Sequence, residues 1–226
     1  GVAHAAVEEV LMREQMEDRI REIHRKVEYM SRLSAGSIGQ AMEAFVKQDA
    51  RIAKQILAQD PEINRLEKDI ENLCITLAAT QSPLASDLRQ MVSIIKIVTD
   101  LERIGDYSCN IAEVVIGLGK YELVKPLERL PLMERTVREM LNSSLMAYFQ
   151  QNIELAYETA RRDDEVDLLY EEIYRDLLLL IKERENLEDQ IIGLILVGRY
   201  LDRIADDATN ICERVIRMKT GEDVKL

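Results

Sequence analysis

The stretch LERIGD at residues 101–106 returns as LDRIAD at residues 201–206. The register continues from NIAE at 110–113 to NICE at 210–213, and seven of the thirteen positions from Leu101 to Glu113 are identical. About one identity is expected by chance from ordinary residue frequencies. The chain therefore carries an internal duplication, which decides its architecture.

A weaker echo lies upstream of each copy. Residues 60–66 resemble residues 163–169, at an offset of 103 rather than 100. Apolar residues recur every three or four residues throughout both regions, which is the period of an amphipathic helix. We therefore predict an all-α protein of six long helices, arranged as two pseudo-symmetric three-helix bundles side by side. The predicted ranges are 8–47, 50–81, 83–118, 131–150, 152–185 and 188–219.

Glycine and proline place the expected breaks. Ser82-Pro83 has the pattern of an N-cap followed by a first-turn proline. Asp60-Pro61 is expected to kink or restart a helix, and a break near residues 34–37 would split the first helix. Gly117 to Gly119 and Lys125-Pro126 mark a linker, so the two domains are expected at 1–121 and 122–226. One continuous six-helix bundle uses the same elements and stays open.

Composition excludes several classes of protein. The net charge of −12 argues against nucleic acid, whose binding needs a basic face. No apolar stretch is long enough to span a membrane, and no glycine-rich phosphate-binding loop occurs. Three cysteines without Cys-x-x-Cys spacing suit a reducing cytoplasm.

The duplicated motif places acids on one helix face. Residues four apart lie on the same side of a helix, so acid and amide side chains line up beside the apolar seam. The stripe comprises Glu102, Asp106, Asn110 and Glu113 in the first copy, and Asp202, Asp206, Asn210 and Glu213 in the second. The upstream echo offers Asp60, Asn64 and Glu67, and its counterpart Asp163, Asp167 and Glu171.

Like charges at this spacing cost about 0.2–0.5 kcal/mol on an isolated helix, and a bound cation would turn that repulsion into coordination. Only His4 and His24 are present, and neither lies near the repeats, which argues against a Cys/His zinc site. Carboxylate and water ligands suit magnesium, calcium, manganese or iron. Ordinary surface salt bridges, such as Arg203 with Asp206, remain the alternative.

These residues resemble the signatures of the PhoU family. The resemblance is carried by Ser86 to Arg89, by Lys96 to Asp106 with 110–113, and by the matching second copy followed by Gly221-Glu222. It implies two three-helix bundles, often dimeric, in the cytoplasm or peripheral to the inner face of the membrane. It implies a non-enzymatic, negative regulator of the phosphate regulon and of phosphate uptake. The implied partners are the phosphate ABC transporter and the regulon's sensor histidine kinase.

The resemblance also implies oxygen-ligated metal, with iron, zinc, magnesium and manganese all used across the family. Carried over residue by residue, Glu102, Asp106, Asp202 and Asp206 would be the central ligands. Two positions depart from the pattern: Asn64 stands where the family often has Asp, and Tyr200 stands opposite Asp100. We therefore expect a weaker first site and a second site that lacks an accessory carboxylate.

Other functions remain to be weighed. A PhoU-like domain also forms the cytoplasmic tail of sodium/phosphate cotransporters, and a metal-free helical scaffold would use the same fold. A ferritin-like di-iron oxidase needs Glu-x-x-His on two helices, and neither His4 nor His24 follows a Glu at that spacing. Nucleophilic catalysis lacks a Ser/His or Cys/His pair near the repeats.

Overall fold

The computed structural model describes residues 1–120 and 129–226. The predicted domain boundary at 121/122 and the predicted turn at Lys125-Pro126 lie outside the described residues, so the two-domain division stays a prediction. The described residues contain helices and no strand, which confirms the all-α prediction. Their helices are α1 (Val2–Lys47), α2 (Ala50–Thr80), α3 (Ala85–Leu118), α4 (Arg129–Gln150), α5 (Ile153–Arg161), α6 (Asp163–Glu183) and α7 (Glu188–Thr220).

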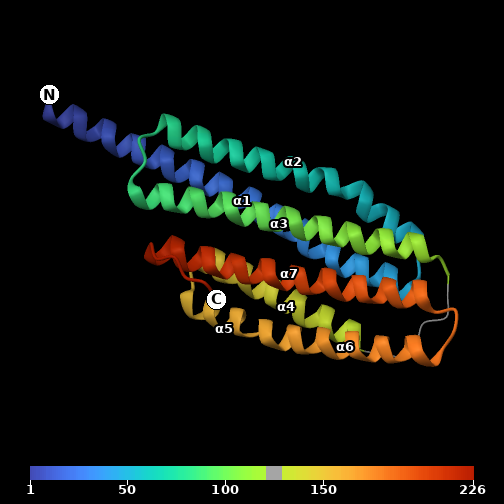
Figure 1. The fold of residues 1–226 in the computed structure, drawn as a ribbon. Coiled ribbons are helices and arrows are strands. Elements are labelled where there is room, and N and C mark those ends of the chain that lie inside the picture. Colours follow the sequence, from blue (N-terminus) through green and yellow to red (C-terminus); the bar gives the residue numbers. More distant parts are fainter. Residues whose placement is uncertain (121–128) are drawn as a thin grey trace.

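The helices form two related groups joined along their centre. Helices α1, α2 and α3 pack together as the first half, and α4 to α7 pack together as the second half. Helices α3 and α7 lie side by side between them and run in opposite directions (Figure 1). Because α3 and α7 carry the two copies of the motif, the duplication meets itself at the middle of the molecule.

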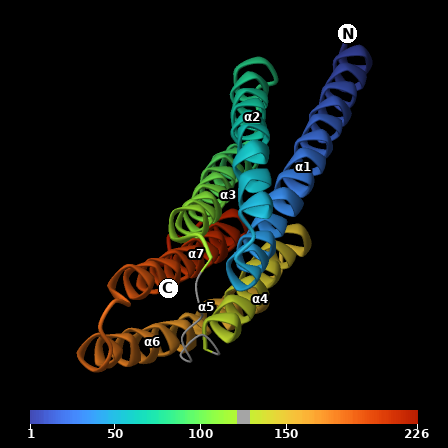
Figure 2. The ribbon, with the colours of Figure 1, turned by 90° about the vertical axis from the view of Figure 1, so that its right-hand side faces the viewer.

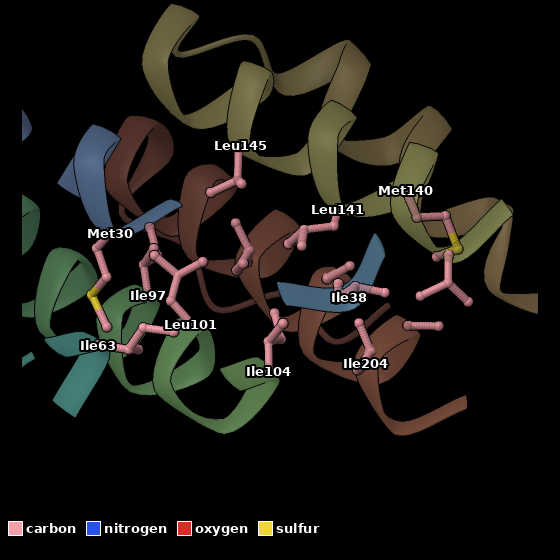
Figure 3. Packing of buried hydrophobic residues seen from close by; sticks show 14 of the residues in the cluster. Met30, Ile38, Ile63, Ile97, Leu101, Ile104, Met140, Leu141, Leu145 and Ile204 are labelled. Atoms are coloured by element: carbon pink, nitrogen blue, oxygen red, sulfur yellow. The ribbon is translucent and has the colours of Figure 1, made fainter. Parts of the chain in front are cut away.

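One hydrophobic core runs through both halves. Leu101 and Ile104 of α3 and Ile204 of α7 have no exposed surface, and they meet Ile38 of α1 and Leu141 of α4 (Figure 3). The apolar seam predicted along residues 94–115 is buried. The seam fixes which faces of α3 and α7 turn inward, and so leaves the acidic stripes on the faces beside it.

The second helices of the two halves differ near the upstream echo. Helix α2 continues through Pro61, whereas the corresponding helix of the second half, predicted as one piece over 152–185, ends at Arg161 and restarts at Asp163. The single-helix prediction was therefore wrong there. Asp163, Asp164 and Glu165 form the first turn of α6, where carboxylates favour a helix start because they face the positive end of the helix dipole.

The first helix is continuous, as its predicted range 8–47 has it, whereas the third begins two residues later than predicted. Helix α1 is unbroken through 34–37, where the Ser37 hydroxyl bonds the Ser34 carbonyl at 2.7 Å and the Ser34 hydroxyl bonds the Leu101 carbonyl at 3.1 Å. These serines pack α1 against α3 rather than ending it. Helix α3 begins at Ala85, and its first turn is capped by Asp87, whose carboxylate accepts from the Leu84 amide at 3.0 Å. Ser82 has a φ of 45° and precedes the helix.

The two halves share one further turn that the sequence comparison did not reveal. Helices α1 and α4 end in left-handed residues, Gln48 with φ 52° and Gln151 with φ 51°. Asp49 then accepts from the Arg51 amide at 2.9 Å, and Asn152 accepts from the Leu155 amide at 3.0 Å. Both acceptors cap the next helix, so the duplication extends into the first helix of each half.

Candidate metal centre

The first acidic groove lies between α2 and α3. It is an open groove of about 510 Å³ lined by Leu57, Asp60, Arg103, Asp106, Tyr107, Cys109, Asn110 and Glu113. Helix α2 comes close to α3 at Gly105, where an added Cβ would lie 3.2 Å from Asp60 Oδ1 and 3.1 Å from Ile63 Cδ1. The absence of a side chain at Gly105 therefore lets Asp60 approach the stripe on α3. The structure brings Asp60, Asp106, Asn110 and Glu113 together, as the sequence predicted.

Burial and mutual repulsion disfavour charge on the acids of this groove. Burial, followed by a hydrogen bond and the charge of Asp106, raises the pKa of Glu102 to about 8. Burial and the charge of Asp106 also raise the pKa of Asp60. Asp60 Oδ1 is buried and has no hydrogen-bond partner. The groove thus holds carboxyl groups that lack a compensating cation.

Asn64 lies one turn beyond Asp60, at the position where an acid was expected. Its amide nitrogen donates a hydrogen bond to Asp60 Oδ2 at 3.4 Å. Its own oxygen is buried without a partner. Asn64 therefore offers the groove a neutral oxygen ligand, as the sequence analysis expected.

The second acidic cluster lies between α6 and α7. It comprises Asp163 and Asp167 of α6 and Asp202 and Asp206 of α7. Burial, followed by a hydrogen bond with Asp167 and the charges of Asp206 and Asp167, raises the pKa of Asp202 to about 7. Burial and the charges of Asp167, Asp206 and Asp164 raise the pKa of Asp163 to about 6. Each half therefore pairs acids from its second helix with acids from its motif helix.

Asp202 is more enclosed than its counterpart Glu102. The residue is 7% exposed, and one oxygen lies 3.1 Å from an Arg199 guanidinium nitrogen while the other has no partner. Asp163 Oδ1 is also buried and without a partner. The second cluster therefore has unpartnered carboxyl oxygens on both of its helices.

Two predicted residues of the second copy lie elsewhere. The Asn210 amide is 3.5 Å from Asp100 Oδ1 and 3.5 Å from Asp207 Oδ1, so it faces the first half rather than the acidic cluster. Glu213 accepts from the Leu226 amide at 2.8 Å, which ties it to the C-terminal segment. Their counterparts, Asn110 and Glu113, line the first acidic groove. The two sites therefore differ at these positions.

The expected loss of a ligand at Tyr200 was wrong. Asp100 is 2% exposed and faces α7, where Arg103 pairs with it and lies 3.4 Å from Asp207. Tyr200 of α7 stacks on Tyr107 of α3 where these two helices pack together, with ring centroids 6.2 Å apart. Asp100 is thus a junction residue rather than a ligand of the first groove, and its replacement by tyrosine in the second copy removes nothing from the second cluster.

Cys109 is a groove residue that the sequence did not single out as a candidate ligand. It is half-buried on the groove wall, and burial together with the charge of Asp60 raises the pKa of its thiol to about 12. Arg103 and Tyr107 were also missed. Arg103 is three residues from Asp106 and Tyr107 is three residues from Asn110, which places both beside the stripe, but such spacing alone does not say which neighbouring helix they meet.

The carboxylate and amide side chains of the two sites are of the right chemical type for an oxygen-ligated cation, but they do not form a complete coordination shell. Carboxylate and amide oxygens are the ligands of hard cations, and unpartnered examples occur in both halves. Within residues 1–120 and 129–226, however, no three His, Cys, Asp or Glu side chains lie close enough together to hold a metal ion. Side-chain rotation would be needed to complete a coordination shell.

A comparison with protein families identifies the class. The model described as "PhoU domain" matches residues 27–115 and 130–215, one match in each half. The chain belongs to the PhoU family. The two matches coincide with the two halves that meet along α3 and α7.

Individual relatives are similar over nearly the whole chain. A protein of Clostridium acetobutylicum described as "Phosphate-specific transport system accessory protein PhoU homolog" is 37% identical over 220 residues, 96% of this chain and 99% of the relative. A homolog of the same description from Aquifex aeolicus is 38% identical over 206 residues, 91% of this chain and 93% of the relative. The match therefore includes both acidic sites.

Solved structures show the same fold. The crystal structure of the phosphate transport system regulatory protein PhoU from Streptococcus pneumoniae superposes with a TM-score of 0.88 at 29% identity, over 93% of this chain and 100% of that one. PhoU from Pseudomonas aeruginosa gives a TM-score of 0.88 at 30% identity, over 91% and 99%. None of the described helices is long and apolar enough to cross a membrane.

Proposed function

We propose that this protein is a non-enzymatic accessory regulator of phosphate transport that keeps the phosphate regulon off and restrains uptake when phosphate is plentiful. The observation that carries the proposal is similarity over nearly the whole chain to phosphate-specific transport accessory proteins. The proposed partners are components of the phosphate ABC transporter and the regulon's sensor histidine kinase. Its proposed place is the cytoplasm, free or against the inner face of the membrane, as a homodimer.

Deletion of the gene in its native cell tests the regulatory role. Phosphate-regulon transcripts are expected to rise in high phosphate and to fall again when the wild-type gene is returned. Unchanged transcript levels in high phosphate would contradict the proposal. Reciprocal pull-downs of transporter ATPase and sensor kinase test the partners, and light scattering after gel filtration tests the dimer. Copurification only with a sodium/phosphate cotransporter would favour the cotransporter-domain alternative.

Both acidic sites are proposed to bind oxygen-ligated metal ions. Support comes from the unpartnered carboxyl oxygens of Asp60, Asp163 and Asp202 and from the raised pKa values of the acids around them. A bound cation would neutralise each cluster and draw α2 to α3 and α6 to α7. Iron, zinc, magnesium and manganese are the candidate ions, and Cys109 adds a soft donor to the first groove alone.

Variants that remove one site at a time test the assignment. Chelator-treated protein is reloaded with each metal, and bound metal is counted by elemental analysis. Glu102→Gln with Asp106→Asn is expected to remove the metal of the first site only, and Asp202→Asn with Asp206→Asn that of the second only. Glu8→Gln with Glu9→Gln removes the same charge from an exposed stretch of α1 and is expected to change nothing.

Stability gives a second readout of the same sites. Metal at a hundredfold excess over its Kd stabilises a folded protein by about 2.7 kcal/mol.

Full metal content in both site variants would overturn the assignment. No binding of any of the four metals by wild-type protein would favour the metal-free scaffold, an alternative supported by the absence of a preformed three-ligand cluster in the described residues.

A further inference from the structure

A row of cationic side chains follows the line where α3 and α7 pack together. The members of this row on α3 are seven residues apart, which keeps them on one face of the helix. We name as the cationic seam the residues Arg89, Lys96 and Arg103 of α3 and Arg203 and Arg214 of α7. A concentration of positive charge on one face is unexpected in a chain whose net charge is −12.

Contacts between α3 and α7 involve three of these cations, Arg89, Arg103 and Arg214. Arg103 of α3 lies 3.4 Å from Asp207 of α7. At the other end, the Arg89 guanidinium reaches Gly221, where Nε would lie 3.5 Å from an added Cβ. Between these contacts, the charge of Arg214 acts on Asp100 of α3. Figure 2 shows α3 and α7 adjacent from a second direction.

Two of these cations act on acids without forming an ion pair: the charge of Arg214 acts on Asp100, and the charge of Arg203 acts on Asp206. Among the described residues, no ion pair is formed by Arg89, Lys96, Arg203 or Arg214. Arg89, Lys96 and Arg203 are exposed, and Arg214 Nε is buried without a hydrogen-bond partner. The acids beneath the seam, Asp100 and Asp207, are 2% and 4% exposed, so their charges are turned inward. Arg89 and Lys96 therefore present exposed positive charge that no ion pair offsets.

The seam changes character along its length. Past Arg103 and Arg203 come the stacked rings of Tyr107 and Tyr200, which are half-buried. Farther along α7, Leu196 is 37% exposed. One end therefore offers charge and the other offers aromatic and apolar surface, a combination frequent in protein interfaces.

We propose that the cationic seam is a docking site for an acidic segment of a partner protein, with apolar residues at one end of that segment. Acidic groups flank the seam on both sides, in the first acidic groove and in the second acidic cluster. A flat anionic membrane would meet those flanking carboxylates, whereas a single narrow segment lying along the seam would not. Charge complementarity therefore favours a linear acidic partner.

This inference deepens the proposed function by naming a contact surface, and it does not depend on metal binding. The probe is a fluorescein-labelled octaglutamate-dileucine peptide, measured by anisotropy at low salt, with an octalysine-dileucine peptide for comparison. Wild-type protein is expected to bind the acidic peptide more tightly than the basic one, although its net charge favours the reverse. Rising salt is expected to weaken this binding because exposed charges are screened.

A triple variant with a matched control assigns the binding to the seam. Arg89→Gln, Lys96→Gln and Arg214→Gln together are expected to weaken peptide binding about tenfold or more. Arg161→Gln, Arg175→Gln and Lys54→Gln remove the same charge from exposed positions without ion pairs and are expected to leave it within about twofold. The double variant Arg89→Gln with Lys96→Gln changes only exposed side chains and serves if the triple variant misfolds.

Three results would overturn the proposal. The first is no preference of wild-type protein for the acidic peptide. The second is equal loss of binding in the seam and control variants. The third is seam-dependent binding to phosphatidylglycerol vesicles with no peptide binding, which would make the surface a membrane contact. Peptide binding that survives in the metal-site variants separates this test from the metal assignment.

Discussion

At the junction of the two halves, Asp100 and Asp207 bury two carboxyl groups against each other. Asp207 is 4% exposed, and burial followed by the charge of Asp100 raises its pKa to about 7, against the opposing charge of Arg103. An unfolded chain has an Asp pKa of about 3.9. The folded protein therefore binds this proton more tightly than the unfolded chain does, and it loses stability as the pH rises from about 4 to about 7.

Asp207→Asn should remove that pH-dependent loss. The variant is expected to match wild type near pH 4 and to be more stable by about 1–3 kcal/mol at pH 8, because the uncharged amide does not need a proton to stay buried. Urea unfolding of chelator-treated protein across this range measures the difference. The exposed Glu185→Gln variant should show no such trend. A constant difference between Asp207→Asn and wild type from pH 4 to pH 8 would show that the buried carboxyl gains no proton.

A second buried polar contact between the halves joins Tyr148 to His24. Tyr148 of α4 is 1% exposed, and its hydroxyl lies 2.5 Å from His24 Nδ1 of α1. The other ring nitrogen of His24 is 3.0 Å from the Gln90 amide of α3. Burial lowers the pKa of His24, so the neutral ring is favoured. The histidine thus serves packing between helices rather than metal binding.

Tyr148→Phe should destabilise the protein by about 1–2 kcal/mol, because it leaves His24 Nδ1 buried without a partner. Tyr174→Phe removes a hydroxyl from a side chain that is 42% exposed and should change stability by less than about 0.5 kcal/mol. Chemical unfolding of both variants at neutral pH makes the comparison. Equal effects at the two positions would mean that the Tyr148 hydroxyl contributes nothing specific.

At the scale of the element, the matching turns after α1 and α4 hold each first helix against its second. Asn152→Ala should cost about 1 kcal/mol, because the Leu155 amide loses its side-chain acceptor. Gln151→Gly should instead stabilise the protein by about 0.5 kcal/mol, because glycine adopts a φ of 51° without a Cβ clash. Unfolding midpoints at an unchanged m-value measure both effects. Changes of the same sign would contradict this account of the turn.

The same elements show how far sequence can go. The duplicated motif gave the helices, their buried seam and the acids at Asp60, Asp106, Asp163 and Asp206, because helical period determines which residues share a face. It did not give the break at Arg162, where neither glycine nor proline marks the end of a helix. Nor did it place Asn210, because periodicity does not say which of two neighbouring helices a side chain at the edge of a face will meet.

The junction of α3 and α7 explains that limit in physical terms. In register, Asp100 corresponds to Tyr200, and Tyr107 corresponds to Asp207. Because the helices run in opposite directions, this exchange brings Asp100 to Asp207 at one end of the crossing and Tyr107 to Tyr200 at the other. The pattern is visible in the sequence only once the antiparallel pairing is known. Tertiary packing therefore decided which acids belong to the sites and which to the junction.

At the scale of the whole molecule, the continuous core predicts that the two halves unfold together. Leu101, Ile104 and Ile204 are fully buried at the shared seam, so separating the halves would expose each of them. Truncating a buried Leu or Ile to Ala typically costs about 2–5 kcal/mol. A junction that depends on such contacts is expected to transmit the loss of one half to the other.

Calorimetry of metal-free protein should therefore show one transition, with the van't Hoff enthalpy equal to the calorimetric enthalpy. Ile204→Ala should lower the stability of both halves by the same amount, read as faster amide exchange in α2 as well as in α6. Ile173→Ala, which truncates a buried side chain of α6 away from the seam, controls for a general loss of stability. Two resolved transitions, or protection lost in α6 and α7 alone, would show instead that each half folds as a separate domain, with its acidic site independent of the other.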